Sequence, residues 1–423
     1  MLISSTLGIA SLKAQVVVSV GDDLIQKIAD ADTGATVIIK SGYHKASYAN
    51  VRINKDITIV GEEGKPKPKV YIKQIDLQGT DINVSISGIN FSSAVFDSLT
   101  NTEDTTNLQD SYFINLPTDF VSANKITVTN CIIHNFDRCV VRGDRAAYSV
   151  NDITFDNCII YDLHGAGDYG LFRFKSSITF GTFTLTNSTC YDFKNSIVNL
   201  ESQSDLAESI TVNQCTFDQM DNTKDAKALF DIRNNTNASA NMTIKNCIFG
   251  NVNKTNPDLK YYGFRFTDES NDEFSFNIAA PGFVVDTFQY DQVNWDKDQY
   301  NDIMDPQWEF PDTGNFYLPT DSPLLTLSED SKVVGDPRWQ QGVSAVHGVS
   351  DIIYGIYPNP ATTELNVMLT KPAYIAIYNS QGTMLEQRNV SSASLQSFNV
   401  SGYPAGVYFL RINNHATQKF VIK

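Results

Sequence analysis

Five short, similar segments of this sequence carry ten polar side chains at matching positions. These side chains include the residue types that acid–base chemistry requires. The segments are CVVRGD, GLFRFK, SIVNLE, ALFDIR and YGFRFT. Apolar and polar residues alternate in each segment, which predicts a strand with one outward face. The outward positions form two series: Arg142, Arg173, Asn199, Asp231 and Arg265, and then Asp144, Lys175, Glu201, Arg233 and Thr267.

This outward patch has the composition needed to bind a carboxylate and to remove a neighbouring proton. Arginine or lysine can neutralise a carboxylate, which acidifies the adjacent C–H, and a lysine can then act as the base. Lys175 is the first choice for the base, with Arg233 or Arg173 neutralising charge. The predicted catalytic residues are Lys175, Arg233 and Glu201. The predicted ligand-binding residues of the patch are Arg142, Arg173, Asn199, Asp231 and Arg265.

A purely structural interpretation of the same patch stays open. Lys175, Glu201 and Arg233 alternate in sign, which is typical of an ion-pair ladder across a sheet. Each opposed pair in such a ladder contributes roughly 0.2–1 kcal/mol.

A second group of candidates surrounds the Gly-rich segment LHGAGDYG. Tyr161 and Tyr191 are equivalent positions of successive repeats, and we expect them to bind ligand by stacking on sugar rings. His164 is a further candidate, as a ligand-binding residue or a base. In the alternative interpretation the tyrosines pack under turns and the glycines only permit a tight bend.

Internal repeats predict the fold that positions these residues. Five segments align: TVTNCII, TFDNCII, TLTNSTC, TVNQCTF and TIKNCIF. Their fourth residues are spaced by 27, 30, 27 and 32 positions: Asn130, Asn157, Asn187, Gln214 and Asn246. Two or three short strands in each repeat, with little helix between them, predict the coils of a right-handed parallel β-helix. We expect the Asn column to be structural, with side-chain amides hydrogen-bonded up the stack at a buried bend.

All six cysteines lie in the repeats, and four of them share one column: Cys131, Cys158, Cys215 and Cys247. This placement favours a stack of buried free thiols, although disulfides remain an alternative in an exported protein. No Cys-x-x-Cys pair or His-rich spacing indicates a zinc site, and we predict no metal-ligating residues.

Composition excludes several classes of protein. The chain has 423 residues, a net charge of −16 and a hydrophobic fraction of 42%, which argues against disorder and against nucleic-acid binding. There are 37 asparagines, and 24 of them lie between Asn101 and Tyr300. This excess favours turns and strands. No apolar stretch after the N-terminus is long enough for a transmembrane helix.

The two ends differ from the repeats. Residues 1–14 are apolar and small and predict a secretory signal peptide. The predicted β-helix covers residues 15–340, with a capping helix at Asp22–Ala31 and a Pro-rich closing segment at Asp305–Trp339. Residues 341–350 are a predicted linker. Residues 351–423 read as short strands with tight turns, which predicts a small Ig-like β-sandwich.

The C-terminal part resembles a known export signal. The strings YPNPATTELNV, IAIYNSQGTMLEQ, PAGVYFLRI and KFVIK resemble the type A sorting domain of the type IX secretion system of Bacteroidetes. The resemblance implies export by that machinery, removal of the domain, and release or attachment at the outer-membrane surface.

The body resembles pectin-lyase-like β-helix proteins. The segments GATVIIKSGYHK, INKDITIVGEEG and VVGDPRW are most similar to secreted Bacteroidetes families without assigned function. Those families are similar in turn to the chondroitinase B and alginate lyase family, which implies a possible Ca²⁺ cofactor and an acidic polysaccharide as partner. Lys175 in FKSS resembles the lysine of the chondroitinase-type motif. However, Glu201 stands where that motif has arginine, and Leu171, Phe172 and Arg173 stand where it has calcium-binding glutamates.

These resemblances lead to a main expectation and two alternatives. We expect a monomeric, secreted or surface-attached protein that binds an acidic polysaccharide and could cleave it by β-elimination. The first alternative is a non-catalytic adhesin or glycan-binding solenoid. The second is a purely structural surface solenoid.

Overall fold

The computed structural model divides into two compact units, Met1–Gly342 and Val343–Lys423, and each is described separately. The structure describes residues 14–46, 49–97, 102–106, 108–109, 111–117, 121–144, 148–175, 179–202, 209–224, 227–234, 241–253, 257–266, 273–284, 302–308, 311–340, 353–369, 372–391, 394–412 and 416–423. The expected signal peptide (except residue 14) and the expected linker lie outside these residues.

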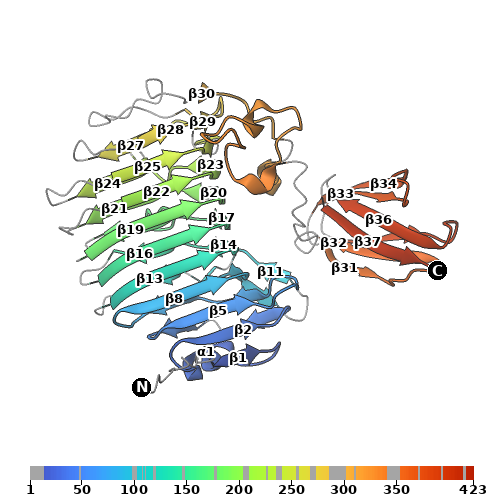
Figure 1. Cartoon of the computed structure of the whole chain (residues 1–423), viewed down its shortest axis with the longest axis horizontal. Coiled ribbons are helices and arrows are strands. Elements are labelled where there is room, and N and C mark those ends of the chain that lie inside the picture. The colour runs from blue at the N-terminus through green and yellow to red at the C-terminus, as the bar shows by residue number, and fades with distance from the viewer. Residues whose placement is uncertain are drawn as a thin grey trace, which may run out of the picture. The chain divides into compact units, whose positions relative to one another are not determined.

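The first unit is a parallel β-helix, as the repeats predicted (Figure 1). A complete coil supplies one strand to each of three parallel sheets. Sheet A contains β1 (Gln15–Val18), β2 (Ala35–Ile39), β5 (Ile57–Gly61), β8 (Ile82–Ser87), β13 (Val121–Thr129), β16 (Tyr148–Asp156), β19 (Thr179–Thr186), β22 (Ser209–Asn213), β25 (Asn241–Lys245) and β28 (Glu273–Ser275). Sheet B contains β3 (Tyr43–Lys45), β6 (Lys69–Tyr71), β9 (Asn90–Ser92), β14 (Ile132–Phe136), β17 (Ile159–Leu163), β20 (Thr189–Lys194), β23 (Thr216–Asp221), β26 (Ile248–Phe249), β29 (Ile278–Ala279) and β30 (Asp302–Ile303). Sheet C contains β4 (Asn50–Ile53), β7 (Gln74–Leu77), β12 (Tyr112–Asn115), β15 (Cys139–Gly143), β18 (Phe172–Lys175), β21 (Val198–Ser202), β24 (Lys227–Asn234) and β27 (Tyr261–Phe266).

The Asn column forms the bend between sheets A and B, but its physical reason differs from our expectation. All five residues have left-handed backbone, with φ between 48° and 55°. Asparagine tolerates this region better than other non-glycine residues. Asn130 and Asn157 are exposed, and no hydrogen bond joins two side chains of the column. Asn187 and Asn246 bond instead to Asp156 and Asn213. The left-handed backbone therefore explains why asparagine recurs in this column, and the prediction of a ladder of hydrogen-bonded amides is wrong.

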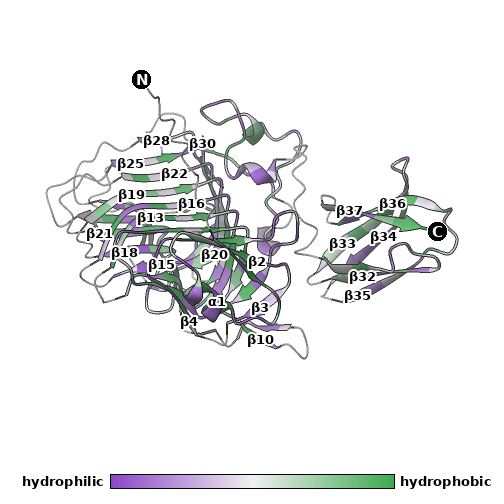
Figure 2. Ribbon diagram, turned by 60° about the horizontal axis from the view of Figure 1, so that its bottom comes forward, coloured by the Kyte–Doolittle hydropathy of each residue, from purple (hydrophilic) through white to green (hydrophobic). Residues whose placement is uncertain are grey.

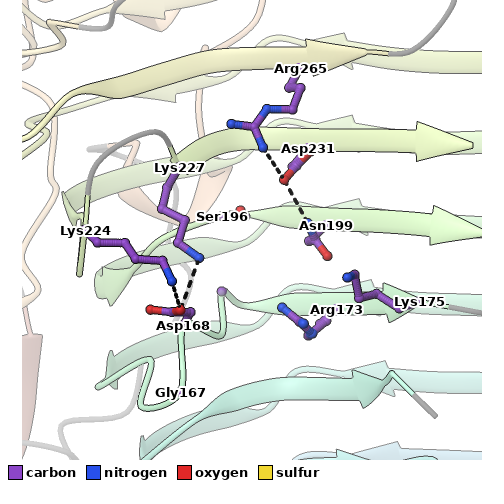
Figure 3. Close-up of a pocket in the computed structure, with 11 residues that line it drawn as sticks. Gly167, Asp168, Arg173, Lys175, Ser196, Asn199, Lys224, Lys227, Asp231 and Arg265 are labelled. Carbon is purple, nitrogen blue, oxygen red and sulfur yellow. Dashed lines mark hydrogen bonds and ion pairs between the residues drawn. The ribbon is translucent and has the colours of Figure 1, made fainter.

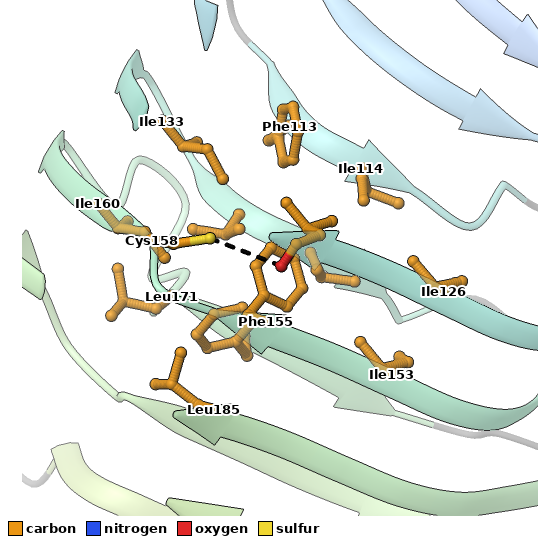
Figure 4. Packing of buried hydrophobic residues seen from close by; sticks show 14 of the residues in the cluster. Phe113, Ile114, Ile126, Ile133, Ile153, Phe155, Cys158, Ile160, Leu171 and Leu185 are labelled. Carbon is orange, nitrogen blue, oxygen red and sulfur yellow. Dashed lines mark hydrogen bonds between the residues drawn. The ribbon is translucent and has the colours of Figure 1, made fainter. Parts of the chain in front are cut away.

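Inward-facing side chains of the three sheets fill the core of the helix. Buried and partly exposed positions alternate along the strands of sheet A, as in β13 and β16, and Figure 2 shows the matching alternation of hydropathy. Ile153 of sheet A, Ile160 of sheet B and Ile114 of sheet C meet in this core (Figure 4). Stacking therefore buries the apolar face that no coil could bury alone.

The six cysteines are buried free thiols. Cys158 Sγ donates to the Val128 carbonyl oxygen at 3.6 Å (Figure 4). Burial raises the pKa of the Cys158 thiol to about 11. The thiol therefore stays protonated and unreactive.

Separate elements cover the ends and the outer face of the helix. The capping helix α1 (Leu24–Asp30) buries Leu24 and Ile28, and the Asp23 side chain accepts a hydrogen bond from the Gln26 N–H at its start. A hairpin of β10 (Val95–Asp97) and β11 (Thr102–Asp104) adds to the N-terminal half.

The closing segment (302–308 and 311–340) contains three short 3-10 helices, η1 (Pro311–Thr313), η2 (Pro323–Leu325) and η3 (Pro337–Trp339). It packs apolar side chains against Ile248 and Ile278 of sheet B. The predicted Pro-rich segment therefore covers the outer face of that sheet.

The second unit consists of two antiparallel sheets with their own hydrophobic core. One sheet contains β31 (Ile353–Tyr357), β32 (Glu364–Leu369) and β35 (Leu395–Asn399). The other contains β34 (Met384–Val390), β33 (Ala373–Tyr378), β36 (Gly406–Ile412) and β37 (Ala416–Ile422). Within the described residues of the whole chain, no helix is long and apolar enough to cross a membrane.

Candidate functional site

A pocket of about 310 Å³ lies on the outer face of sheet C (Figure 3). Its floor comes from β18, β21, β24 and β27, and its wall comes from the turns that lead into these strands. The lining residues are Gly167, Asp168, Gly170, Arg173, Lys175, Ser196, Asn199, Lys224, Lys227, Asp231 and Arg265. Five of the predicted site residues therefore surround one cavity: Arg173, Lys175, Asn199, Asp231 and Arg265.

The floor of the pocket includes four of the five outward side chains of the first predicted series, all except Arg142. The strand register pairs Arg142 with Arg173, Arg173 with Asn199, Asn199 with Asp231, and Asp231 with Arg265. Asn199 Nδ2 donates to Asp231 Oδ2 at 3.1 Å, and Arg265 Nη1 donates to the same oxygen at 3.4 Å. Asn199 Oδ1 is buried and has no hydrogen-bond partner among the described residues. It is available to accept a hydrogen bond from a ligand.

The wall of the pocket is built by the Gly-rich segment LHGAGDYG. Its Asp168 accepts a hydrogen bond from Lys224 and lies 3.9 Å from Lys227 Nζ. Gly170 permits the approach of this segment to the next coil, because a Cβ there would lie 2.2 Å from the Ser196 carbonyl oxygen. The segment therefore brings a carboxylate and two lysines to one side of the floor.

Arg142 lies outside the pocket, on the neighbouring strand β15. Asp144 links it to the floor: Arg142 Nε lies 2.6 Å from Asp144 Oδ1, and Arg173 Nε lies 3.5 Å from Asp144 Oδ2. Two guanidinium groups thus share one carboxylate, so the pair keeps a net positive charge.

The three predicted catalytic residues fall in one column, as the sequence indicated. The register pairs Lys175 with Glu201 and Glu201 with Arg233. Lys175 Nζ forms an ion pair with Glu201 Oε2 at 2.5 Å, so this amine already contacts a carboxylate. The side chain of Arg233 lies outside the described residues.

The electrostatics of the pocket differ in sign from those of the chain. The lining includes five cationic and two anionic side chains, whereas the chain carries −16. Burial lowers the pKa of Lys227, helped by the nearby Lys224 and Arg173, while Asp168 opposes the effect. Burial alone would raise the pKa of Asp168, but the hydrogen bonds from Lys224 and Thr223 and the charges of the two lysines together outweigh burial and lower that pKa. The cavity therefore holds a carboxylate that stays ionised and a lysine that loses its proton more easily than usual.

The second group of predicted residues lies elsewhere. Tyr161 and Tyr191 stack on each other on the outer face of sheet B, with ring centroids 5.0 Å apart. Tyr191 is only 8% exposed and packs against Phe316 of the closing segment, so we leave it out of the proposed site. His164 is exposed beside Asp162, at 3.1 Å, and the hydrogen bond to that carboxylate raises its pKa.

Sequence reasoning missed the wall of the pocket. Lys224 and Lys227 precede the strand segment ALFDIR and were not among the predicted site residues, and Asp168 was not linked to them. A signal existed, because Lys224 and Lys227 lie at the same bend of the coil that LHGAGDYG occupies two repeats earlier. The distance from Asp168 to these lysines, however, depends on the path of two turns.

The described residues do not fit a calcium ion. Both carboxylates of the pocket already contact cations: Asp168 contacts Lys224 and Lys227, and Asp231 contacts Arg265. In the described part of the chain, no group of three or more His, Cys, Asp or Glu side chains is arranged to hold a metal.

Comparisons with known families identify the C-terminal unit and leave the β-helix without an assigned activity. Residues 42–193 match a domain of unknown function (DUF4957), and residues 210–339 match another (DUF5123). No curated protein matches the chain. Residues 355–423 match the secretion system C-terminal sorting domain. The protein is therefore a parallel β-helix exported by the type IX secretion system to the cell surface or the medium.

Proposed function

We propose that the pocket on sheet C binds the acidic sugar units of a polysaccharide outside the cell. The observation that carries this proposal is the excess of three positive charges in a cavity of a strongly acidic chain. A cleft lined by one sign of charge concentrates ligands of the opposite sign. Arg173, Lys227 and Lys224 would neutralise the carboxylate of the sugar.

The floor also suits the neutral part of a sugar. Asn199, Asp231 and Ser196 offer amide, carboxylate and hydroxyl groups, which can bond to sugar hydroxyls. The unpartnered Asn199 Oδ1 supports this role, because a buried acceptor without a partner costs roughly 1–3 kcal/mol until it is satisfied. A sugar O–H donated to this atom would recover part of that cost.

Cleavage by β-elimination is the second candidate function. Lys227 supports it, because its lowered pKa provides a neutral amine at a lower pH than an ordinary lysine would. Lys175 was the base predicted from the sequence, but its amine is held in an ion pair with Glu201. If the protein binds the polysaccharide without cleaving it, the protein is a surface adhesin or glycan-binding solenoid.

One experiment separates these functions. The full chain is titrated with pectate, alginate and hyaluronan, and with a neutral polysaccharide as control, by affinity electrophoresis and calorimetry. Each mixture is also followed for the ultraviolet absorbance of an unsaturated uronate.

Lys227→Gln is compared with Lys332→Gln, which removes one positive charge from an exposed position outside the pocket. Loss of a hydrogen bond to a charged group should weaken binding of the acidic glycan about 10-fold or more in Lys227→Gln. Lys332→Gln should bind like the wild type. Equal affinity of both variants, or equal binding to neutral and acidic chains, contradicts the proposal. If the wild type produces this absorbance and Lys227→Gln does not, the protein also has lyase activity.

A further inference from the structure

Tyr169 contacts Arg173, one of the two arginines that line the pocket. It follows Asp168 in the Gly-rich segment and is 7% exposed. The guanidinium carbon of Arg173 lies 4.7 Å from the centroid of the Tyr169 ring. The Tyr169 hydroxyl donates to Asp144 Oδ2 at 2.6 Å, and this oxygen also faces Arg173 Nε. One residue therefore contacts Arg173 with its ring and orients the carboxylate that Arg173 pairs with.

The ring itself is held firmly. Tyr112 packs edge-on against the ring, with the two ring centroids 5.4 Å apart. The guanidinium carbon of Arg138 lies 5.7 Å from the centroid of the Tyr169 ring. The Tyr169 carbonyl oxygen accepts a hydrogen bond from Asn195 Nδ2 at 3.0 Å. Burial and the hydrogen bond to Asp144 raise the pKa of the phenol well above its usual range. The hydroxyl therefore stays a neutral donor at every physiological pH.

We propose that Tyr169 is a positioning residue that holds the Arg173 guanidinium in the orientation that binds the anionic ligand. The proposal rests on the proposed function of the pocket. A free arginine side chain has many rotamers, and a planar guanidinium stacked on a ring loses fewer of them on binding. A ring holds the cation without neutralising it, and Asp144, which faces Arg173, is shared with Arg142. Lys175 and Arg265, by contrast, each pair with a carboxylate. Arg173 therefore keeps part of its charge for the ligand.

The test is a set of variants of the full chain, titrated with whichever of pectate, alginate and hyaluronan the wild type binds. Tyr169→Phe keeps the ring and should stay within about threefold of wild-type affinity. Tyr169→Leu loses the ring and should weaken binding about 2- to 30-fold, the range expected for a cation–π contact of about 0.5–2 kcal/mol. In an Arg173→Gln background, Tyr169→Leu should cause no further loss, because its effect passes through Arg173.

Arg173→Lys keeps the test independent of the buried tyrosine. It preserves the charge but not the planar stacking, and it should weaken binding to an extent similar to Tyr169→Leu. Circular dichroism and thermal unfolding of each variant report on the fold. Wild-type affinity in Tyr169→Leu overturns the inference, and so does an equal loss with and without Arg173. If the wild type binds no acidic glycan, the proposed function fails and the inference fails with it. If it binds and only the Tyr169 effects are absent, the inference alone fails.

Discussion

The ion pair that closes the β-helix provides a quantitative test of the structure. Asp336 is 2% exposed, and its Oδ2 lies 2.9 Å from Arg338 Nε and accepts a hydrogen bond from Thr189 Oγ1 at 2.7 Å. Arg338 Nη2 reaches across two coils and donates to Asn157 Oδ1 at 2.7 Å. These contacts fasten the closing segment to sheet B. The substitution Asp336→Ala removes the carboxylate together with its hydrogen bonds and leaves the guanidinium almost buried.

The expected change in the free energy of unfolding follows from burial and from pH. Leaving one partner of a buried ion pair should lower the free energy of unfolding by about 3–5 kcal/mol. Burial raises the pKa of Asp336 from 3.8 to about 6, so the folded state binds the proton more tightly than the unfolded state between these values. The stability contributed by this carboxyl therefore rises as pH falls through that window. From a pH of about 8 to one of about 5, the wild type should gain about 1.4 kcal/mol over Asp336→Ala.

The assay is equilibrium urea unfolding of both proteins, followed by tryptophan fluorescence at the two pH values. Trp308 and Trp339 both belong to the closing segment, so the signal reports on the region that is changed. A cost of less than about 1 kcal/mol for Asp336→Ala at neutral pH would contradict this prediction. A difference in free energy of unfolding between the two proteins that shrinks as pH falls would also contradict the prediction. Such a result would mean that Asp336 titrates below its ordinary pKa.

Three further predictions concern the bends and the pocket. Asn130→Ala should lower the free energy of unfolding by about 1 kcal/mol while Asn130→Gly changes it little, because φ is 52° at this position; urea unfolding checks both. Affinity for an acidic glycan should fall as pH rises through the lowered pKa of Lys227, since only the ammonium form attracts the anion. Calorimetry across pH should show this loss below the usual lysine range, and Lys227→Arg should move it to higher pH. Gly170→Ala should weaken binding and cost roughly 1–3 kcal/mol of stability, because its Cβ would overlap the Ser196 backbone; an unchanged thermal midpoint and affinity would contradict this.

The repeats allowed the fold to be predicted because stacked coils impose the same backbone at the same position. The alternation in GLFRFK and SIVNLE was enough to place Arg173 opposite Asn199 and Lys175 opposite Glu201. The short strands predicted within residues 351–423 are present, among them β32, β33 and β36. The reason for the Asn column was wrong, because a conserved spacing does not reveal whether a side chain or its backbone angle is required.

The site was only partly predictable. Outward positions on strands follow from a period of two, so the floor of the pocket could be named in advance. The wall could not, because Asp168, Lys224 and Lys227 come from turns of different coils whose paths are set by close backbone contacts such as that of Gly170. Tyr191 looked equivalent to Tyr161 until the closing segment, far away in sequence, was found to cover it.

A structure of the full chain bound to an acidic oligosaccharide tests the central claim most directly. We predict a sugar carboxylate within hydrogen-bond distance of the Arg173 guanidinium, beside Lys224 and Lys227, and a sugar hydroxyl that donates to Asn199 Oδ1. Arg173 should keep its place on the Tyr169 ring. A ligand seated instead on the outer face of sheet B near Tyr161, or a pocket that stays empty at saturating oligosaccharide, would contradict the account.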